Sequence, residues 1–262
     1  MRICRPFSNA REVALKAFDI EFYGGSEEQL VEEIKTTSQE DFSYIVTPNV
    51  NHVVQLQDDT DLRAAYDQAS HRICDSRVLL PFLKFCNLDL EEAIPGSTLT
   101  ARLIHLANEQ HWKVCVVGCE ASNMMLLREK FPGITFYHHY PPMGFIKDPE
   151  ATAACVDFIV NHPAHLVVFA LGCPTQEIMA HKVFQTGKAK GVGLCVGGSL
   201  NFLSGAVPRA PEWIQKLYLE WLHRICSEPR RLSGRYARDG LRFIPILVKQ
   251  LRSKQPLSYK GV

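Results

Sequence analysis

Apolar residues along the chain gather in short runs that alternate with longer segments of helical periodicity. The two most regular runs are residues 164–171 and 192–196, which are rich in valine and leucine and lead into glycine. A short run without polar alternation is typical of a strand buried on both faces, and the glycine predicts a sharp turn after it. Residues 174–185 lie between these runs and have helical spacing, with Pro174 suited to the first turn.

The same alternation extends through the first half of the chain. Residues 18–23 alternate in the manner of one strand, Ser26 followed by Gln29 predicts a helix start, and Ser97 or Thr98 can cap a later helix. Further strands are predicted at residues 44–46, 73–74, 113–118 and 134–137, and further helices at residues 50–58, 60–70, 79–85, 97–106 and 121–130.

Strands that alternate with helices of about ten to fifteen residues predict a parallel sheet in an α/β fold. Connections between such strands are almost always right-handed crossovers. We therefore predict a doubly wound, Rossmann-like and mostly parallel sheet. A chain of 262 residues is long enough to bury this core and to carry an appendage.

The pattern changes at Pro211, after which apolar and charged residues alternate at helical spacing to about residue 225. Residues 229–262 then contain nine Lys or Arg against a single acid, Asp239, a charge of +8. Because the whole chain carries +1, residues 1–228 carry −7. The sequence predicts two parts, an α/β catalytic core at 1–210 and a helical, basic appendage at 211–262.

Aromatic and aliphatic residues interleaved with Arg and Lys favour a helix that lies in the interface of an anionic membrane. Two alternatives stay open at this point, a helix pair that packs on the core and merely exposes its charges, and nucleic-acid binding. The second is not favoured because no nucleic-acid motif accompanies the basic residues. No run approaches the roughly eighteen apolar residues of a membrane span.

The nine cysteines are odd in number and scattered, and none forms a C-x-x-C pair, which favours a reducing compartment without a disulfide framework or zinc site. Arg2 and Arg5 are not followed by a long apolar segment, so we expect no secretory signal. His138 and His139 have no acidic or cysteine ligand near them in sequence, and we predict no metal there.

Polar and glycine-containing segments follow several predicted strands, and the carboxyl edge of an open α/β sheet is where ligands bind. Each segment also has a simpler reading: Asn49 and Asp75 as helix caps, Gln176 as a solvent-facing residue, and the Gly197-Gly198 pair as a plain tight turn. An oxidoreductase is not favoured, since residues 191–196 lack the third glycine of the dinucleotide fingerprint.

The order and spacing of these segments resemble the WecG/TagA/CpsF glycosyltransferases, glycosyltransferase family 26, over residues 18 to about 248. The resemblance rests on Thr47-Pro48-Asn49, Asp75, Pro95-Gly96-Ser97, His138-His139-Tyr140, Gly144-Phe145, residues 171–177, residues 196–205, Arg209-Ala210-Pro211, residues 220–224 and residues 228–231.

The resemblance implies an inverting transfer of a sugar from a UDP-sugar, of the UDP-glucose or UDP-N-acetylmannosamine type, to a polyprenyl-diphosphate-linked saccharide. It places the protein in bacterial surface or exopolysaccharide synthesis, peripheral to the cytoplasmic face of the inner membrane, without a cofactor. The core would bind the donor, the appendage would dock on the membrane, and a homo-oligomer is possible. The alternative is a non-catalytic scaffold of the same fold at the membrane surface.

The resemblance also assigns residues. Asp75 matches the base that takes the proton from the acceptor hydroxyl. Arg224 and Arg231 match arginines that would meet the charge on the departing diphosphate. The other expected substrate contacts are Thr47, Asn49, Gln176, Gly197, Gly198 and Asn201.

Several positions depart from the family pattern and surround the expected donor pocket. Ser76 stands where a glycine is usual, Thr98 and Asn201 stand where acids are usual, and a third arginine position falls on Gly234, beside Arg235. The sequence therefore does not identify the sugar.

Overall fold

The computed structural model of the protein describes residues 15–86, 88, 90, 92–207, 210–211, 214, 222, 225–226 and 229–252, apart from the side chain of Arg231. Its centre is a six-stranded sheet in the order β4-β3-β8-β7-β5-β6, with every neighbouring pair parallel. The strands are β3 (Ser43–Val46), β4 (His71–Arg72), β5 (Lys113–Gly118), β6 (Thr135–His139), β7 (Leu166–Ala170) and β8 (Val192–Cys195). The predicted parallel sheet is confirmed.

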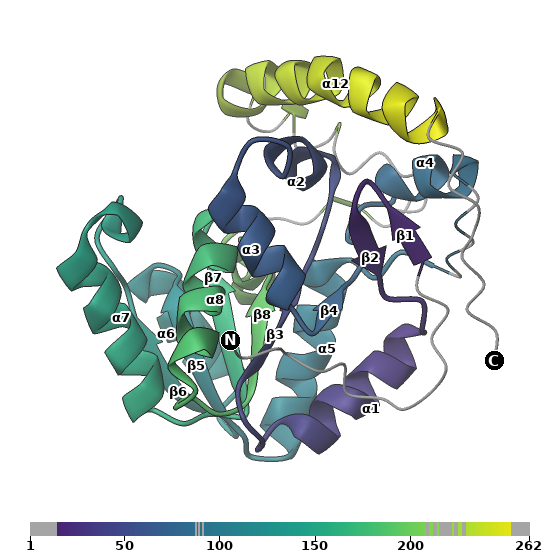
Figure 1. Ribbon diagram of the computed structural model, residues 1–262. Coiled ribbons are helices and arrows are strands. Elements are labelled where there is room, and N and C mark those ends of the chain that lie inside the picture. The colour runs from purple at the N-terminus through teal and green to yellow at the C-terminus, as the bar shows by residue number, and fades with distance from the viewer. Residues whose placement is uncertain are drawn as a thin grey trace, which may run out of the picture.

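Helices cover both faces of this sheet, as expected for a doubly wound fold (Figure 1). Successive strand residues point to opposite faces: in β5, Val114 and Val116 enter one core, and Cys115 and Val117 enter the other. One core is closed by α2 (Val50–Gln55), α3 (Thr60–Gln68), α4 (Leu79–Phe85), α7 (Pro149–Asn161) and α8 (Thr175–Thr186). The other is closed by α1 (Glu27–Thr37), α5 (Gly96–Glu109), α6 (Ala121–Lys130) and α9 (Ser199–Ser204). A short 3-10 helix, η1 (Phe145–Lys147), precedes α7.

Local sequence signals explain where several helices begin. Ser26 and Gln29 form the predicted capping box of α1, and the Asp148 side chain accepts hydrogen bonds from the first N–H groups of α7, which has Pro149 at its first turn. The predicted cap at Ser97 or Thr98 is wrong. Helix α5 begins one residue earlier, at Gly96, and Pro95 precedes it without a side-chain cap.

A hairpin replaces the single strand predicted at residues 18–23. Strand β1 (Leu15–Ala17) pairs antiparallel with β2 (Ile20–Phe22), and Ala17 lies opposite Ile20. The two turn residues, Phe18 and Asp19, have φ values of 54° and 56°, as in the tight turns that suit hairpins. Residues other than glycine rarely adopt positive φ values, so tertiary contacts must hold the turn in place.

Those contacts come from α12 (Pro229–Arg252), which lies across α2 and α4 at one end of the molecule (Figure 1). The buried Phe243 ring packs 5.5 Å from the ring of Phe18 and 5.2 Å from that of Phe82 on α4. The Phe18 N–H also donates to Gln250 Oε1 at 2.9 Å. The basic helix is therefore docked on the body of the protein.

Polar contacts add to this docking. Asn51 on α2 donates to Oδ2 of the buried Asp239, the one acid of the basic segment, at 2.9 Å. Arg242 forms an ion pair with Asp58. Within the described residues, no helix combines the length and the apolar character that crossing a membrane requires. The proposed boundary between residues 210 and 211 stays a prediction.

The aromatic contacts of α12 generate a stability prediction. Replacing Phe243 with alanine should lower the free energy of unfolding by roughly 3–5 kcal/mol, because it removes a buried ring that joins α12, α4 and the hairpin turn. Replacing the exposed neighbour Ile244 with alanine should change it by less than about 1 kcal/mol. Urea denaturation of both variants measures the difference, and equal effects would contradict the docking role of Phe243.

Candidate functional site

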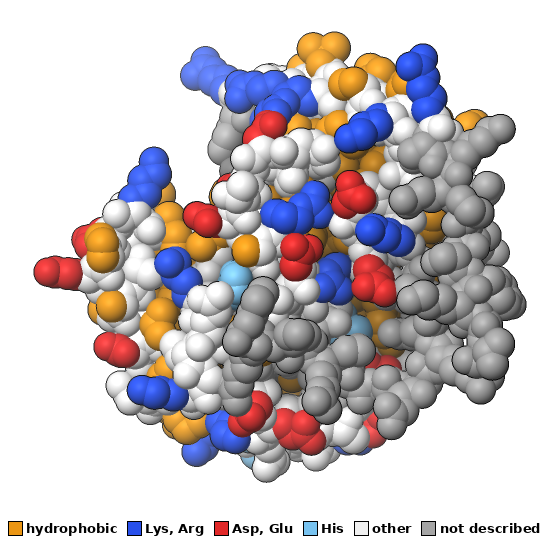
Figure 2. Space-filling model, viewed as in Figure 1, with side chains coloured by type: hydrophobic (Ala, Val, Ile, Leu, Met, Phe, Trp, Pro, Cys, Tyr) orange, Lys and Arg blue, Asp and Glu red, His pale blue; other side chains and the backbone are white. Residues whose placement is uncertain are grey.

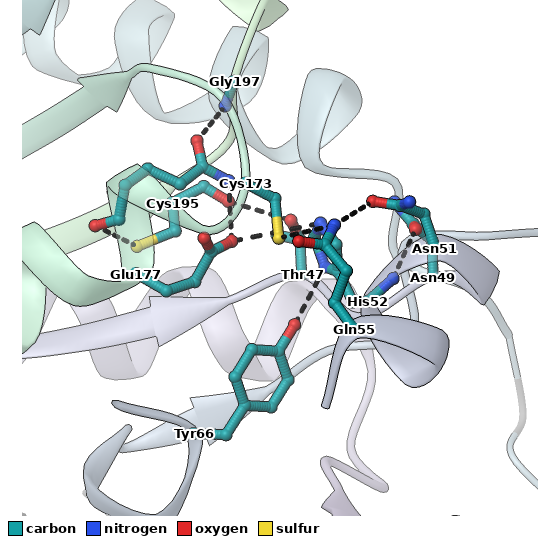
Figure 3. Close-up of polar contacts among 11 residues, drawn as sticks. Thr47, Asn49, Asn51, His52, Gln55, Tyr66, Cys173, Glu177, Cys195 and Gly197 are labelled. Atoms are coloured by element: carbon teal, nitrogen blue, oxygen red, sulfur yellow. Dashed lines mark hydrogen bonds and ion pairs between the residues drawn. The ribbon is translucent and has the colours of Figure 1, made fainter. Parts of the chain in front are cut away.

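The carboxyl ends of three neighbouring strands reach the same level of the sheet. Cys195, the last residue of β8, pairs with Val46, the last residue of β3, and with Phe169 near the end of β7. The segments that follow these strands therefore begin side by side, as Figure 3 shows for Thr47, Cys173 and Gly197. The structure brings most of the predicted site residues together at this edge.

Asp75 follows β4, the next strand along the sheet, and is half-buried. Its Oδ1 accepts a hydrogen bond from the Gly96 N–H at 2.6 Å. A Cβ atom at Gly96 would lie 3.3 Å from Asp75 Oδ1, from Thr47 Cγ2 and from Val196 Cγ1. This glycine therefore lies where the segments after β4, β3 and β8 meet.

The interpretation of Asp75 as a helix cap is wrong. Helix α4 begins only at Leu79, and Ser76 Oγ accepts the hydrogen bonds from the N–H groups of Val78 and Leu79. The N-cap position of α4 is Val78, so Asp75 is not the N-cap of this helix.

Thr47 and Asn49 connect the segment after β3 to its surroundings. The buried Thr47 donates its hydroxyl proton to the Cys195 carbonyl at 2.8 Å, which ties this segment to the end of β8. Asn49 is the N-cap of α2, and its Oδ1 accepts from the His52 N–H at 3.3 Å. The capping role of Asn49 is confirmed, and its contact with a substrate stays a prediction.

Gln176 is buried, with 3% of its surface exposed, so the interpretation of it as a solvent-facing residue is wrong. Its Oε1 accepts from the Gly197 N–H at 2.8 Å, and its Nε2 donates to Glu177 Oε1 at 2.8 Å. Gly197 has a φ of 55°, a left-handed conformation that favours glycine. The Gln176 amide therefore holds the turn after β8.

Gly198 and Asn201 complete this corner. Gly198 precedes α9, and a Cβ at that position would lie 3.8 Å from Asn201 Nδ2. Asn201 Oδ1 accepts from Asn123 on α6 at 3.1 Å. Arg224 and the side chain of Arg231 lie outside the described residues, and their roles stay predictions. Gly234 is exposed on α12.

A buried polar cluster beneath this edge was missed by the sequence analysis. Glu177 is fully buried, His52 Nε2 lies 4.0 Å from its Oε1, and His52 Nδ1 lies 2.8 Å from the Tyr66 hydroxyl (Figure 3). A signal was available, because Ala180 and Phe184 lie three and seven residues after Glu177, so all three share the buried face of α8.

Burial determines the charge states in this cluster. It raises the pKa of Glu177 to about 7 and lowers the pKa of His52 to about 4. A hydrogen bond with the Thr47 main chain opposes the second shift, and the positive charge of Arg235 on α12 adds to it. Burial also raises the pKa of the Cys173 thiol and of Tyr66 well above their ordinary values.

Donor atoms of His52, Cys173 and Glu177 all lie within 4.8 Å of one another, a spacing that could hold a metal ion. Each residue also has a contact within the protein. Tyr66 bonds to His52, Gln55 Nε2 lies 3.6 Å from Cys173 Sγ, and Gln176 bonds to Glu177. His138 instead lies in β6, with Nε2 at 3.0 Å from both the Gly118 and Cys119 carbonyls.

A family model described as the glycosyl transferase WecG/TagA/CpsF family matches residues 15–256. The chain belongs to this family. The resemblance seen in the sequence is thus confirmed, and with it the class of glycosyltransferases.

Curated relatives agree with this membership. A protein of Bacillus spizizenii (strain ATCC 23059 / NRRL B-14472 / W23) is 26% identical over 248 residues, covering 92% of this chain and 93% of its own. A protein of Staphylococcus aureus (strain MRSA252) is 31% identical over 236 residues, covering 85% and 86%. Both are named N-acetylglucosaminyldiphosphoundecaprenol N-acetyl-beta-D-mannosaminyltransferase.

A separate groove of about 430 Å³ lies between η1, α7 and α8, where Lys147, Asp157 and Lys182 line it. Among the residues assigned by the family pattern, none of those that the structure describes lines this groove. The carboxyl edge of the sheet, where those residues converge, is the candidate active site of this glycosyltransferase.

The buried carboxyl of Glu177 generates a pH prediction. Its pKa in the folded protein, about 7, lies above the ordinary value of 4.5, so its contribution to stability is lost as the pH rises between these values. The variant Glu177→Gln carries an amide at this position, which does not ionise in this pH range. Its stability relative to the unmodified protein should rise by up to roughly 3 kcal/mol from pH 4.5 to pH 7.

Urea denaturation at a series of pH values measures this difference. The buried His52 acts in the opposite direction in both proteins, because its lowered pKa makes stability fall as the pH drops from 6.5 towards 4. The matched control is Glu129→Gln, the same substitution at an exposed position on α6. A pH-dependent difference shared by both variants would show that it does not originate in the buried carboxyl.

Proposed function

We propose that this protein transfers a sugar from a UDP-sugar to a polyprenyl-diphosphate-linked saccharide, with inversion at the anomeric carbon, during bacterial surface polysaccharide synthesis. The observation that carries the proposal is the family match over residues 15–256. The names of the relatives add support, because their acceptor, N-acetylglucosaminyldiphosphoundecaprenol, is a sugar linked to a polyprenyl diphosphate. The donor would be of the UDP-glucose or UDP-N-acetylmannosamine type.

In the proposed reaction Asp75 is the general base. Its carboxylate takes the proton from the acceptor hydroxyl while the hydroxyl oxygen attacks the anomeric carbon. The bond from that carbon to the diphosphate oxygen breaks, and UDP leaves with the electron pair. The hydrogen bond from the Gly96 N–H to Asp75 Oδ1 supports this role, because it fixes the carboxylate at the edge of the sheet.

The departing diphosphate needs positive charge or hydrogen-bond donors around it. Helices α5 and α8 begin at this edge, at Gly96 and Thr175, and helix N-termini attract anions. In our proposal Gly197 and Gly198 let the backbone approach the donor closely, and Arg224 and Arg231 contribute charge from the appendage.

The hydrogen bonds that Thr47 and Asn49 already make within the protein indicate which groups they would offer to the UDP-sugar. The Thr47 hydroxyl uses its proton on the Cys195 carbonyl, so it would offer the donor an acceptor oxygen. Asn49 Oδ1 is engaged by the His52 N–H, so Asn49 would offer its NH₂ group to the UDP-sugar as a hydrogen-bond donor. Asn201 would lie beside the Gly197-Gly198 turn.

The exposed face of α12 supports a peripheral position on an anionic membrane. Leu241, Ile244, Val248 and Leu251 recur at helical spacing and are exposed, with Arg and Lys beside them. Figure 2 shows hydrophobic and basic side chains together at this end of the molecule. Helix α12 packs against α2, whose N-cap is Asn49, so such a membrane would lie close to the candidate active site. In the family context this is the cytoplasmic face of the inner membrane.

Departures from the family pattern at Ser76, Asn201 and Gly234 favour one second candidate, a non-catalytic scaffold at the membrane surface. The variant Asp75→Asn separates the two. It keeps an oxygen that can accept from the Gly96 N–H but cannot accept a proton, so transfer should fall roughly a hundredfold or more while UDP binding persists. Release of UDP in the presence of a polyprenyl-diphosphate saccharide measures the rate.

The matched control is Asp157→Asn on the exposed surface of α7, which should transfer at the normal rate. Restoration of normal polysaccharide by Asp75→Asn in cells that lack the protein would favour the scaffold. Failure of the unmodified protein to bind UDP in preference to other nucleotides would contradict the proposal.

The exposed stripe of α12 generates a prediction about membrane binding. Leu241 is 72% exposed, and replacing it with aspartate should weaken binding to phosphatidylglycerol-containing vesicles roughly tenfold or more, because an apolar contact is lost and a negative charge faces the lipid. Vesicle sedimentation measures the bound fraction.

The control is Met125→Asp, the same change of charge at a site on α6 that is 70% exposed. That variant should bind vesicles like the unmodified protein. Equal weakening by both substitutions would indicate a general charge effect and would contradict a specific role of α12.

A further inference from the structure

The side-chain amide of Gln176 has only one orientation that satisfies both of its neighbours. The Gly197 N–H can only donate, so the amide oxygen must face it, and the amide NH₂ then faces Glu177 Oε1. Rotation of the amide by half a turn would place two donors against each other at Gly197. The carboxyl of Glu177 thus anchors the other end of the amide in the orientation that holds the turn after β8.

Glu177 lowers the stability of the folded protein at this position. It is fully buried, and its Oε2 has no hydrogen-bond partner among the described residues. A buried polar group without a partner lowers stability, and an apolar side chain of similar size would avoid that loss. A residue that weakens the fold locally while fixing a neighbour is expected at a functional site.

Nearby groups from other elements do not replace this carboxyl. His52 on α2 faces Glu177 at 4.0 Å, which is too long for a hydrogen bond, and its other ring nitrogen is engaged by Tyr66 on α3. Figure 3 shows His52 and Tyr66 on one side of Glu177 and Gly197 on another. Towards the edge of the sheet, Glu177 Oε1 accepts a hydrogen bond from Gln176 Nε2.

We infer that Glu177 is a positioning residue for the donor pocket, which fixes the Gln176 amide and, through it, the Gly197-Gly198 turn. The part of this inference that concerns the donor rests on the proposed function. The part that concerns the turn rests only on the two hydrogen bonds of 2.8 Å.

The experiment compares three single variants and one double variant of the full chain. Glu177→Met removes the acceptor at similar volume, Glu177→Gln keeps an acceptor oxygen, and Gln176→Met removes the link itself. The first measurement is hydrogen exchange at the Gly197 amide, followed by NMR. We expect exchange to be roughly five- to tenfold faster in Glu177→Met and in Gln176→Met, and close to normal in Glu177→Gln.

The second measurement is the kinetics of transfer from the UDP-sugar. Glu177→Met should raise KM for the donor roughly fivefold or more with a smaller change in kcat, and Glu177→Gln should restore it. In the double variant Gln176→Met with Glu177→Met, the second substitution should add nothing, because Glu177 acts through Gln176.

The outcomes separate the inference from the proposed function. Unchanged exchange at Gly197 in Glu177→Met would overturn the inference, and so would additive effects in the double variant. Faster exchange with an unchanged donor KM would overturn the role in the donor pocket. If the unmodified protein binds no UDP-sugar, the proposed function fails, while exchange still decides whether Glu177 fixes the turn. Should Glu177→Met not fold, Glu177→Leu, which also lacks an acceptor oxygen, takes its place in both measurements.

Discussion

The pairing of β8 with β3 on one side and with β7 on the other is the constraint on which the site depends. Gly193 in the middle of β8 allows it, because a Cβ there would lie 2.7 Å from the Phe42 ring and 2.9 Å from Tyr44 Cβ. In the register of these pairs, the three strands end at nearly the same level. Segments far apart in sequence then share one corner, and short hydrogen bonds such as that from Thr47 to the Cys195 carbonyl hold them together.

Much of this arrangement could be predicted from the sequence, because burial on both faces of a parallel strand leaves a continuous apolar run. Strands β3, β5, β6, β7 and β8, most helices and the segments that carry Thr47, Asp75 and Gly197 follow from that pattern. Strand β4, at His71–Arg72, instead lies just before the strand predicted at residues 73–74. The hairpin turn at Phe18 could not be predicted in this way. Its backbone conformation is held by Phe243 and Gln250, more than two hundred residues away, and local sequence carries no trace of such contacts.

The interior of the candidate site was less predictable for a different reason. A glutamate or histidine in a helix is usually solvated, so Glu177 and His52 do not stand out in the sequence even though both are buried. Their importance depends on partners from three other segments, and only the folded chain brings these together. Asp75 was assigned by family resemblance, whereas its bond with Gly96 is a tertiary contact between the segment after β4 and the start of α5.

Arg235 lies on the exposed surface of α12, yet its charge lowers the pKa of His52 in the interior. Surface and core are thus electrically linked across α2. An anion that pairs with Arg235, from a lipid or from a substrate, would screen the positive charge of Arg235 and so raise the pKa of His52. Association with that anion under acidic conditions would therefore be accompanied by proton uptake, and its affinity would increase as the pH falls towards the pKa of His52.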